Sequence, residues 1–129
     1  MKIKTSELTG AALDWAVAKC EDILHPWGYI RVQDGRTMWI TPGDHETADA
    51  WHQYSPSTDW AQGGPVIEWE GISTVQQGDA ADWVGSVYNY AADDWHLHTQ
   101  GPTPLIAACR CYVASKLGDE VEIPEELAP

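Results

Sequence analysis

The chain of 129 residues has no phenylalanine, three cysteines, and seven lysine and arginine residues in total. The shortage of basic residues argues against general nucleic-acid binding, which depends on cationic side chains that displace counterions from phosphates. It also disfavours binding to an anionic membrane surface. Twenty acidic residues outweigh the bases and give a formal net charge of −13. This acidity favours solubility, a cationic partner or mimicry of DNA.

The cysteines, Cys20, Cys109 and Cys111, are odd in number and lack the spacing of a disulfide framework. This usage argues against a secreted scaffold and fits a reducing, cytoplasmic compartment. Cys109 and Cys111 lie about 200° apart around the axis of an expected helix. They therefore cannot share a metal ion and are expected to be buried apolar residues. The chain has no apolar run long enough to span a bilayer, and its start does not resemble a signal peptide.

Tryptophan and tyrosine are abundant: the chain has eight and five of them. Their rings carry a polar group, so they are favoured where an apolar surface must also meet water, a ligand or a partner. Trp15 is expected in the core, and Trp39 and Trp83 alternate with polar neighbours as strand residues do. Trp51 and Trp60 lie in or beside a long polar stretch, and we predict that they are exposed ligand contacts.

Two long helices and two hairpins are predicted from the residue pattern. The first helix runs from an N-cap at Thr9 to about residue 22, and the last runs from an N-cap at Thr103 to Gly118. Strands at 29–33 and 36–40 flank Asp34-Gly35, a pair that tolerates the positive φ of a type I′ turn. Strands at 72–77 and 83–88 are expected to form a second hairpin, and residues 2–5 are expected to form a short opening strand.

The predicted class is α+β, with an antiparallel sheet of two hairpins packed against an N-terminal and a C-terminal helix. Residues 1–118 are expected to form a single domain. Residues 119–129 carry five acids and no base and are expected to form a solvated acidic tail. Between the hairpins, residues 42–59 are predicted to form a long polar loop, and Gly63-Gly64-Pro65 to begin a short helix.

Residues 57–65 are the strongest candidate site, because they gather hydroxyl, carboxylate, amide and indole groups just before an expected helix start. Free main-chain N–H groups at such a start can bind an anion, and glycine allows close approach. The alternative interpretation is that Ser57, Thr58 and Asp59 cap turns while the glycines shape a tight bend. Thr103 marks a second helix start with the same two interpretations.

Arg110 lies two turns inside the last helix and is one of three arginines. In so acidic a chain it could bind a phosphate or carboxylate through paired hydrogen bonds, or pair with an acid at the surface. His96 and His98 have too few partner ligands to predict a metal site. The sequence has no nucleophile elbow, zincin motif or deaminase spacing, so we expect neither enzymatic activity nor a cofactor.

Three segments of the chain are distinctive: residues 4–20, residues 54–68 with Tyr-Ser-Pro-Ser-Thr-Asp-Trp-Ala-Gln-Gly-Gly-Pro, and residues 101–121 with Gly-Pro-Thr-Pro-Leu-Ile-Ala-Ala-Cys-Arg-Cys-Tyr. They resemble the NinX-like family of tailed-phage accessory proteins. The resemblance implies a phage origin and action in the cytoplasm of an infected bacterium. It does not imply an activity.

We therefore expect a non-catalytic phage protein that sequesters a small nucleotide-type molecule of host immune signalling, without direct contact with nucleic acid or membrane. The alternative is an acidic protein-interaction module or DNA mimic that inhibits a basic host or phage protein. Exposed tryptophan would also suit a homo-oligomer. The predicted ligand-binding residues are Trp51, Tyr54, Ser57, Thr58, Asp59, Trp60, Gln62, Gly63, Gly64, Thr103 and Arg110.

Overall fold

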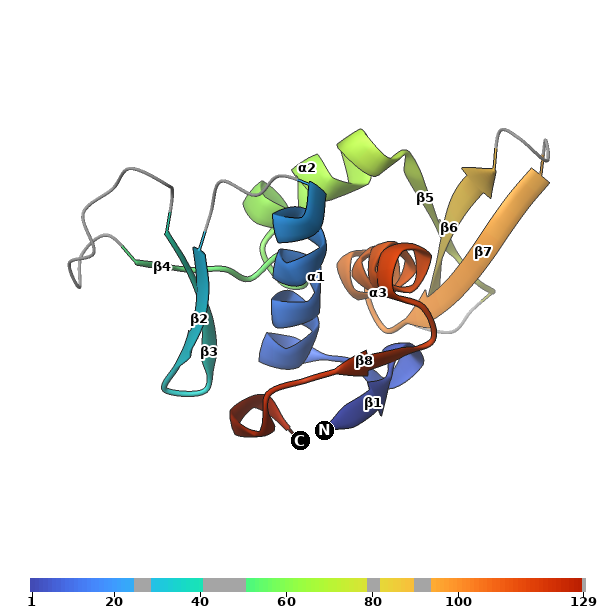
Figure 1. Ribbon diagram of the computed structural model, residues 1–129. Coiled ribbons are helices and arrows are strands. Elements are labelled where there is room, and N and C mark those ends of the chain that lie inside the picture. Colours follow the sequence, from blue (N-terminus) through green and yellow to red (C-terminus); the bar gives the residue numbers. More distant parts are fainter. Residues whose placement is uncertain (25–28, 41–50, 79–81, 90–93, 129) are drawn as a thin grey trace.

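The computed structural model describes residues 1–24, 29–40, 51–78, 82–89 and 94–128 (Figure 1). Its elements are, in chain order, β1 (Lys2–Lys4), η1 (Thr5–Glu7), α1 (Gly10–Leu24), β2 (Tyr29–Gln33), β3 (Arg36–Ile40), β4 (His52–Gln53), α2 (Trp60–Glu70), β5 (Ile72–Gln76), β6 (Trp83–Asn89), β7 (Asp94–Gly101), α3 (Pro104–Leu117), β8 (Glu120–Glu122) and η3 (Glu125–Leu127). The elements η1 and η3 are short 3-10 helices.

Helices α1 and α3 lie next to each other in the centre of the molecule, and a small antiparallel sheet covers the outer side of each (Figure 1). The sheet β2-β3-β4 lies beside α1, and the sheet β5-β6-β7 packs on α3. The α+β class is confirmed. The two predicted hairpins belong to two separate sheets instead of one, because the pair of central helices stands between them.

The first hairpin has the predicted register and turn. Gln33 pairs with Arg36, and the two turn residues Asp34 and Gly35 have φ values of 53° and 71°, which the type I′ turn requires. The edge strand β4 then pairs with β3 inside the stretch that was expected to be a loop. Residues 42–50 of that expected loop lie outside the described residues.

Helix α3 begins and ends as predicted and packs closely on its sheet. The Thr103 hydroxyl accepts from the N–H of Ile106, and Gly118 is the C-cap. A Cβ at Gly101 would lie 2.7 Å from the main-chain nitrogen of Ala107, so no larger residue fits there without a shift. Thr99 adds a hydrogen bond of 2.8 Å from its hydroxyl to the Ala107 carbonyl, which fixes α3 to β7.

The hydrophobic core fills the space between α1 and α3. It includes Leu13, Val17, Tyr112 and Val113, all of which are fully buried. Cys109 and Cys111 are buried free thiols, as predicted, and so is Cys20. Trp15, expected in the core, is half-buried with the Lys19 ammonium 5.7 Å from its ring centroid. Within the described residues, no helix is both long and apolar enough to cross a membrane.

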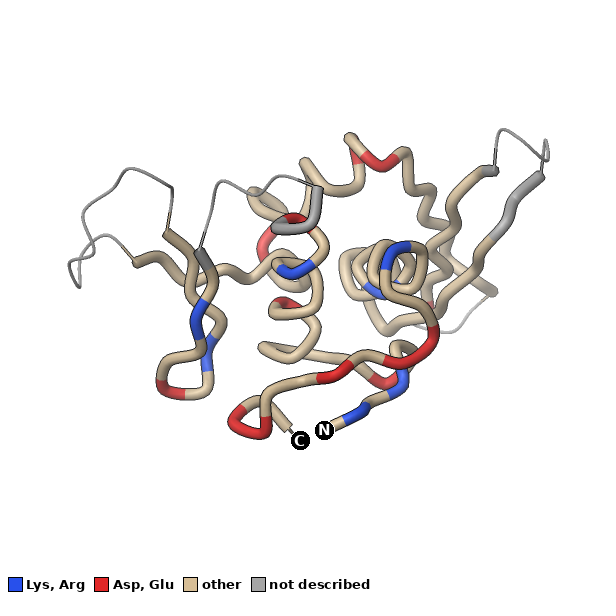
Figure 2. Tube along the Cα trace, viewed as in Figure 1, with Lys and Arg blue, Asp and Glu red and all other residues tan. Residues whose placement is uncertain are grey.

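The C-terminal acidic segment is attached to the body of the protein, where a solvated tail was expected. Strand β8 pairs with β1 so that Glu122 lies opposite Lys2 and Glu120 opposite Lys4. Ile123 and Leu127, which follow β8, are buried. The acids of β8 are thus exposed but lie beside the lysines of β1, as the charge colours of Figure 2 show.

Candidate functional site

Several polar groups of residues 57–62 form hydrogen bonds inside the fold. The Ser57 N–H donates to the buried Asp14 carboxylate at 2.9 Å, and the Asp59 side chain caps α2 by accepting from the Ala61 N–H. The Gln62 amide accepts from the Ser55 N–H and donates to the Gln53 carbonyl, so it holds the preceding segment in place. The capping interpretation of this segment is confirmed for Asp59, whereas the buried Ser57 hydroxyl has no hydrogen-bond partner among the described residues.

The expected helix start at the paired glycines is wrong, because α2 begins at Trp60 and contains both glycines in its interior. The Gly63 N–H donates to the Asp59 carbonyl at 2.8 Å and is therefore not free to bind an anion. A Cβ at Gly63 would lie 2.3 Å from the Pro56 carbonyl oxygen and 2.6 Å from a Leu105 methyl group. Gly63 is thus required for close packing of α2 on its neighbours.

Four of the predicted site residues nevertheless lie together. The starts of α2 and α3 meet at a shallow pocket of about 200 Å³, to which both helix starts contribute. Trp60 is 56% exposed and lies at this pocket with the hydroxyl residues. The predicted residues that line it are Ser57, Thr58, Trp60 and Thr103. The side chains of Asp59 and Thr103 already cap the two helices, so the positive end of each helix is partly satisfied.

The prediction that Trp51 is exposed is wrong. Its side chain is 8% exposed, and the Arg31 guanidinium covers its ring at 4.0 Å from the centroid. The next predicted aromatic residue, Tyr54, is half-buried and packs against Trp39. The two residues therefore belong to the packing of the first sheet, although the Tyr54 ring also borders a pocket with Gln62.

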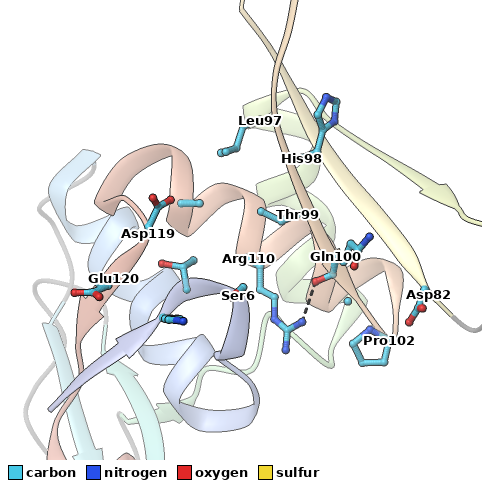
Figure 3. Close-up of a pocket in the computed structure, with 14 residues that line it drawn as sticks. Ser6, Asp82, Leu97, His98, Thr99, Gln100, Pro102, Arg110, Asp119 and Glu120 are labelled. Carbon is cyan, nitrogen blue, oxygen red and sulfur yellow. Dashed lines mark hydrogen bonds between the residues drawn. The ribbon is translucent and has the colours of Figure 1, made fainter.

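Arg110 lies at a pocket with a volume of about 640 Å³ (Figure 3). Its Nε donates to the Leu8 carbonyl and a terminal nitrogen to the Gln100 carbonyl, both at 2.8 Å. These contacts extend the guanidinium from α3 between η1 and β7. Partial burial removes water from the charged group and lowers the pKa of Arg110.

The Arg110 pocket is polar and has charges of both signs. Lys4 joins Arg110 as a cation, while Asp82, Asp119 and Glu120 are the acids. Figure 3 shows Asp119 and Glu120 on one side of Arg110 and Asp82 on the other. Among the described residues, no carboxylate forms an ion pair with Arg110. A guanidinium held without a paired carboxylate can donate hydrogen bonds to an external anion.

A hydroxyl–imidazole pair lies at the edge of this pocket. The Ser86 hydroxyl and His98 Nδ1 are 2.7 Å apart. A nucleophile beside a base is one feature of hydrolases, but these two residues are direct partners in the β6–β7 register, and such cross-strand pairs form hydrogen bonds in ordinary sheets. In the ranges that the structure covers, no cluster of three or more His, Cys, Asp or Glu could hold a metal ion.

Sequence reasoning found Arg110 but missed most other residues of its pocket. They come from β1, η1, β7, β8 and the segments just before β6 and β8, which are far apart in the sequence. Strand β7 itself was not predicted, because its residues 94–101 are mostly polar and do not alternate clearly. The missed residues include Lys4, Ser6, Asp82, His98, Gln100 and Asp119.

These observations define a small α+β protein with a polar pocket at Arg110 and an aromatic pocket beside Tyr54. The model of the family described as "Bacteriophage P22, NinX" matches residues 4–116. The match covers most of the chain, so the protein belongs to this family of phage accessory proteins, and the resemblance predicted from the sequence is confirmed. The search of curated proteins found no match.

Proposed function

We propose that the protein is a non-catalytic binder that sequesters a small anionic molecule of the nucleotide type, a host immune signal, in the pocket at Arg110. It does so in the cytoplasm of the infected cell, needs no cofactor and contacts neither nucleic acid nor membrane. The observation that carries this proposal is the half-buried Arg110 guanidinium, which main-chain carbonyls hold at a pocket of about 640 Å³ without an ion pair to any described carboxylate.

The burial of Arg110 explains why an anion would bind there. A partly desolvated cation gains more from an anionic ligand than an exposed one, because water screens the interaction less. Its remaining N–H donors suit a phosphate or carboxylate, which accepts paired hydrogen bonds from a guanidinium. Lys4 adds a second positive charge to the same pocket. The pocket is within the range of about 300–1,000 Å³ that is typical of small-molecule sites.

The acids of the pocket favour a nucleotide over a simple anion. Asp82, Asp119 and Glu120 would repel a second phosphate, but carboxylates readily accept hydrogen bonds from ribose hydroxyls and from the amino groups of bases. A ligand with one anionic end and several hydroxyl or amino donors therefore fits both kinds of lining residue. The net charge of −13 opposes long-range attraction of such a ligand, so its recognition must be local.

Isothermal titration calorimetry against nucleoside monophosphates, cyclic dinucleotides and ADP-ribose tests the proposal. We expect a compound with a single phosphate to bind and to raise the melting temperature, because the acids of the pocket would repel a second phosphate. Ser6→Tyr is designed to fill the pocket, because Ser6 lines it and is exposed. This variant should lose binding and keep the melting temperature of the free protein. Ser115→Tyr, at an exposed position of α3 that does not line the pocket, is the matched control.

Two outcomes would overturn the proposal: no heat and no thermal shift with any compound, or equal binding by wild type and Ser6→Tyr. Arg110→Gln should also lose binding. That variant alone is insufficient, because it also removes the hydrogen bonds to the Leu8 and Gln100 carbonyls and so lowers stability.

The second candidate function is a protein-interaction module that engages a basic partner. The net charge of −13 favours it. The C-terminal acids that first suggested it are less suited to this task than expected, because Glu120 and Glu122 lie opposite Lys4 and Lys2. A basic partner would therefore meet a partly compensated surface at β8, and acids elsewhere on the molecule are the better contacts.

A further inference from the structure

An aromatic pocket of about 310 Å³ lies on the side of the molecule where α1, α2 and β3 meet. Three rings line it: Trp39 from β3, Tyr54 from the segment after β4, and Trp69 from α2. Glu21, near the end of α1, adds a carboxylate to the lining of the pocket. The remaining lining residues are Ala61, Gln62, Pro65 and Val66, all from α2.

The rings are held in place by contacts that the fold already contains. Trp39 and Tyr54 pack with ring centroids 5.8 Å apart and a tilt of 31°. The Tyr54 N–H donates to the Thr37 carbonyl, and the Thr37 hydroxyl donates to the Ala11 carbonyl of α1, which fixes this part of the sheet on the helix. Gln62 ties the segment before Tyr54 to α2. Little ordering is therefore required when a ligand enters.

The outer ring of the pocket is unusually accessible. The Trp69 side chain is 70% exposed, which is high for the largest apolar side chain, and an exposed indole is the residue type that most often dominates a binding interface. The other two rings are half-buried, so the pocket has a fixed inner wall and an open outer wall. A partner side chain could enter between them from solvent.

The chemistry of the lining points to a cation. Aromatic faces carry negative quadrupole charge and attract ammonium and guanidinium groups. The Glu21 carboxylate adds a full negative charge, and its field contributes, after the larger effect of burial, to the raised pKa of Tyr54. None of the described residues that line the pocket is basic. Elsewhere in this chain indole faces already have cations over them: Arg31 covers Trp51.

We propose that this aromatic pocket binds a lysine or arginine side chain presented by a basic partner protein. The aliphatic stem of such a side chain packs against Pro65 and Val66, while its charged end lies between the rings and Glu21. The net charge of −13 attracts a basic surface and repels an acidic one, which selects this occupant over a nucleotide whose phosphate would lie beside Glu21. This second site is independent of the ligand proposed for Arg110.

The test uses defined peptides and the side-chain indole N–H signals of the uniformly ¹⁵N-labelled protein. The probes are a heptapeptide with three lysines, the same peptide with three arginines, and neutral peptides with norleucine or citrulline in those places. We expect the basic peptides to shift the Trp39 and Trp69 indole signals in a saturable way, with weak or no shifts from the neutral ones. AMP, added alone, is expected to leave both signals unchanged.

A matched pair of variants separates this pocket from general attraction to an acidic protein. Trp69→Ala and Trp60→Ala both remove an exposed indole from α2, but Trp60 lies at the other pocket. Trp69→Ala should weaken peptide binding about tenfold, whereas Trp60→Ala should leave it unchanged. Glu21→Gln should weaken binding severalfold and reduce its dependence on salt.

Three results would overturn the proposal. They are equal binding of the basic and neutral peptides, equal effects of Trp69→Ala and Trp60→Ala, and peptide-induced shifts that are absent from Trp39 and Trp69 up to millimolar concentration. Shifts of these two indoles by AMP in place of the peptides would assign the pocket to a nucleobase and overturn it as well.

Discussion

The adjacent glycines of α2 provide a sharp prediction, because alanine at the two positions should change stability in opposite directions. A Cβ at Gly63 would lie 2.3 Å from a main-chain oxygen of Pro56, which cannot rotate away, and 2.6 Å from Leu105. Overpacking of this kind costs up to about 3 kcal/mol. Alanine regains about 1 kcal/mol from helix propensity, so the net loss is about 2 kcal/mol. At Gly64 a Cβ would meet no atom within 4 Å, so only the gain of about 1 kcal/mol remains.

The difference between the two variants is therefore about 3 kcal/mol. Urea unfolding followed by tryptophan fluorescence measures it, and with an m-value of about 1–3 kcal/mol/M the two midpoints should differ by roughly 1–3 M. Gly64→Ala should unfold above the wild-type midpoint and Gly63→Ala below it. Midpoints that move together, or a stabilised Gly63→Ala variant, would refute the close approach of α2 to the Pro56 carbonyl.

Further predictions concern buried groups elsewhere. Burial raises the pKa of Asp14, despite the hydrogen bond from the Ser57 N–H. The folded state therefore favours the protonated carboxyl, and the stability that this form contributes is lost as pH rises through the folded pKa. Asp14→Asn, which keeps an acceptor for the Ser57 N–H, should be at least as stable as wild type at pH 7, whereas Asp14→Ala should lose about 1–3 kcal/mol in urea titrations. Burial also raises the pKa of the Cys20 thiol to about 12 and of Cys111 to about 11. In the unfolded chain these thiols ionise at lower pH than in the folded protein. The free energy of unfolding should therefore fall above about pH 9, by up to ~1.4 kcal/mol per pH unit for each thiol. Cys111→Ala should show a shallower fall. Ile123→Ala, in the C-terminal segment, should cost about 2–5 kcal/mol, whereas Glu126→Ala should change stability by less than about 0.5 kcal/mol; equal, small effects would show that this segment is not part of the core.

The elements that could be predicted from the sequence are those with local signals. The Asp34-Gly35 turn dictates the first hairpin, and Thr103 with Pro104 and Gly118 marks both ends of α3. In these places the preferences of one or two residues agree with the fold, so no knowledge of distant contacts is required.

The start of α2 and the strands β4, β7 and β8 depend on partners that the sequence does not reveal. Asp59 carried a cap signal, but the glycines that follow it resemble a turn until the close contact with Pro56 is known. Strand β8 has only three residues and is defined by its register with β1. The candidate pockets were missed for the same reason: their lining residues converge from elements that are distant in the chain.

The pairing of β1 with β8 has a consequence for the order of folding. Residues 2–4 are synthesised well before residues 120–122, to which they bond. Strand β1 must therefore wait until β8 has been synthesised, while α1 and the first hairpin can already associate. Ile3 and Val121, which both become buried in the completed pair, remain accessible to water and to chaperones during that interval.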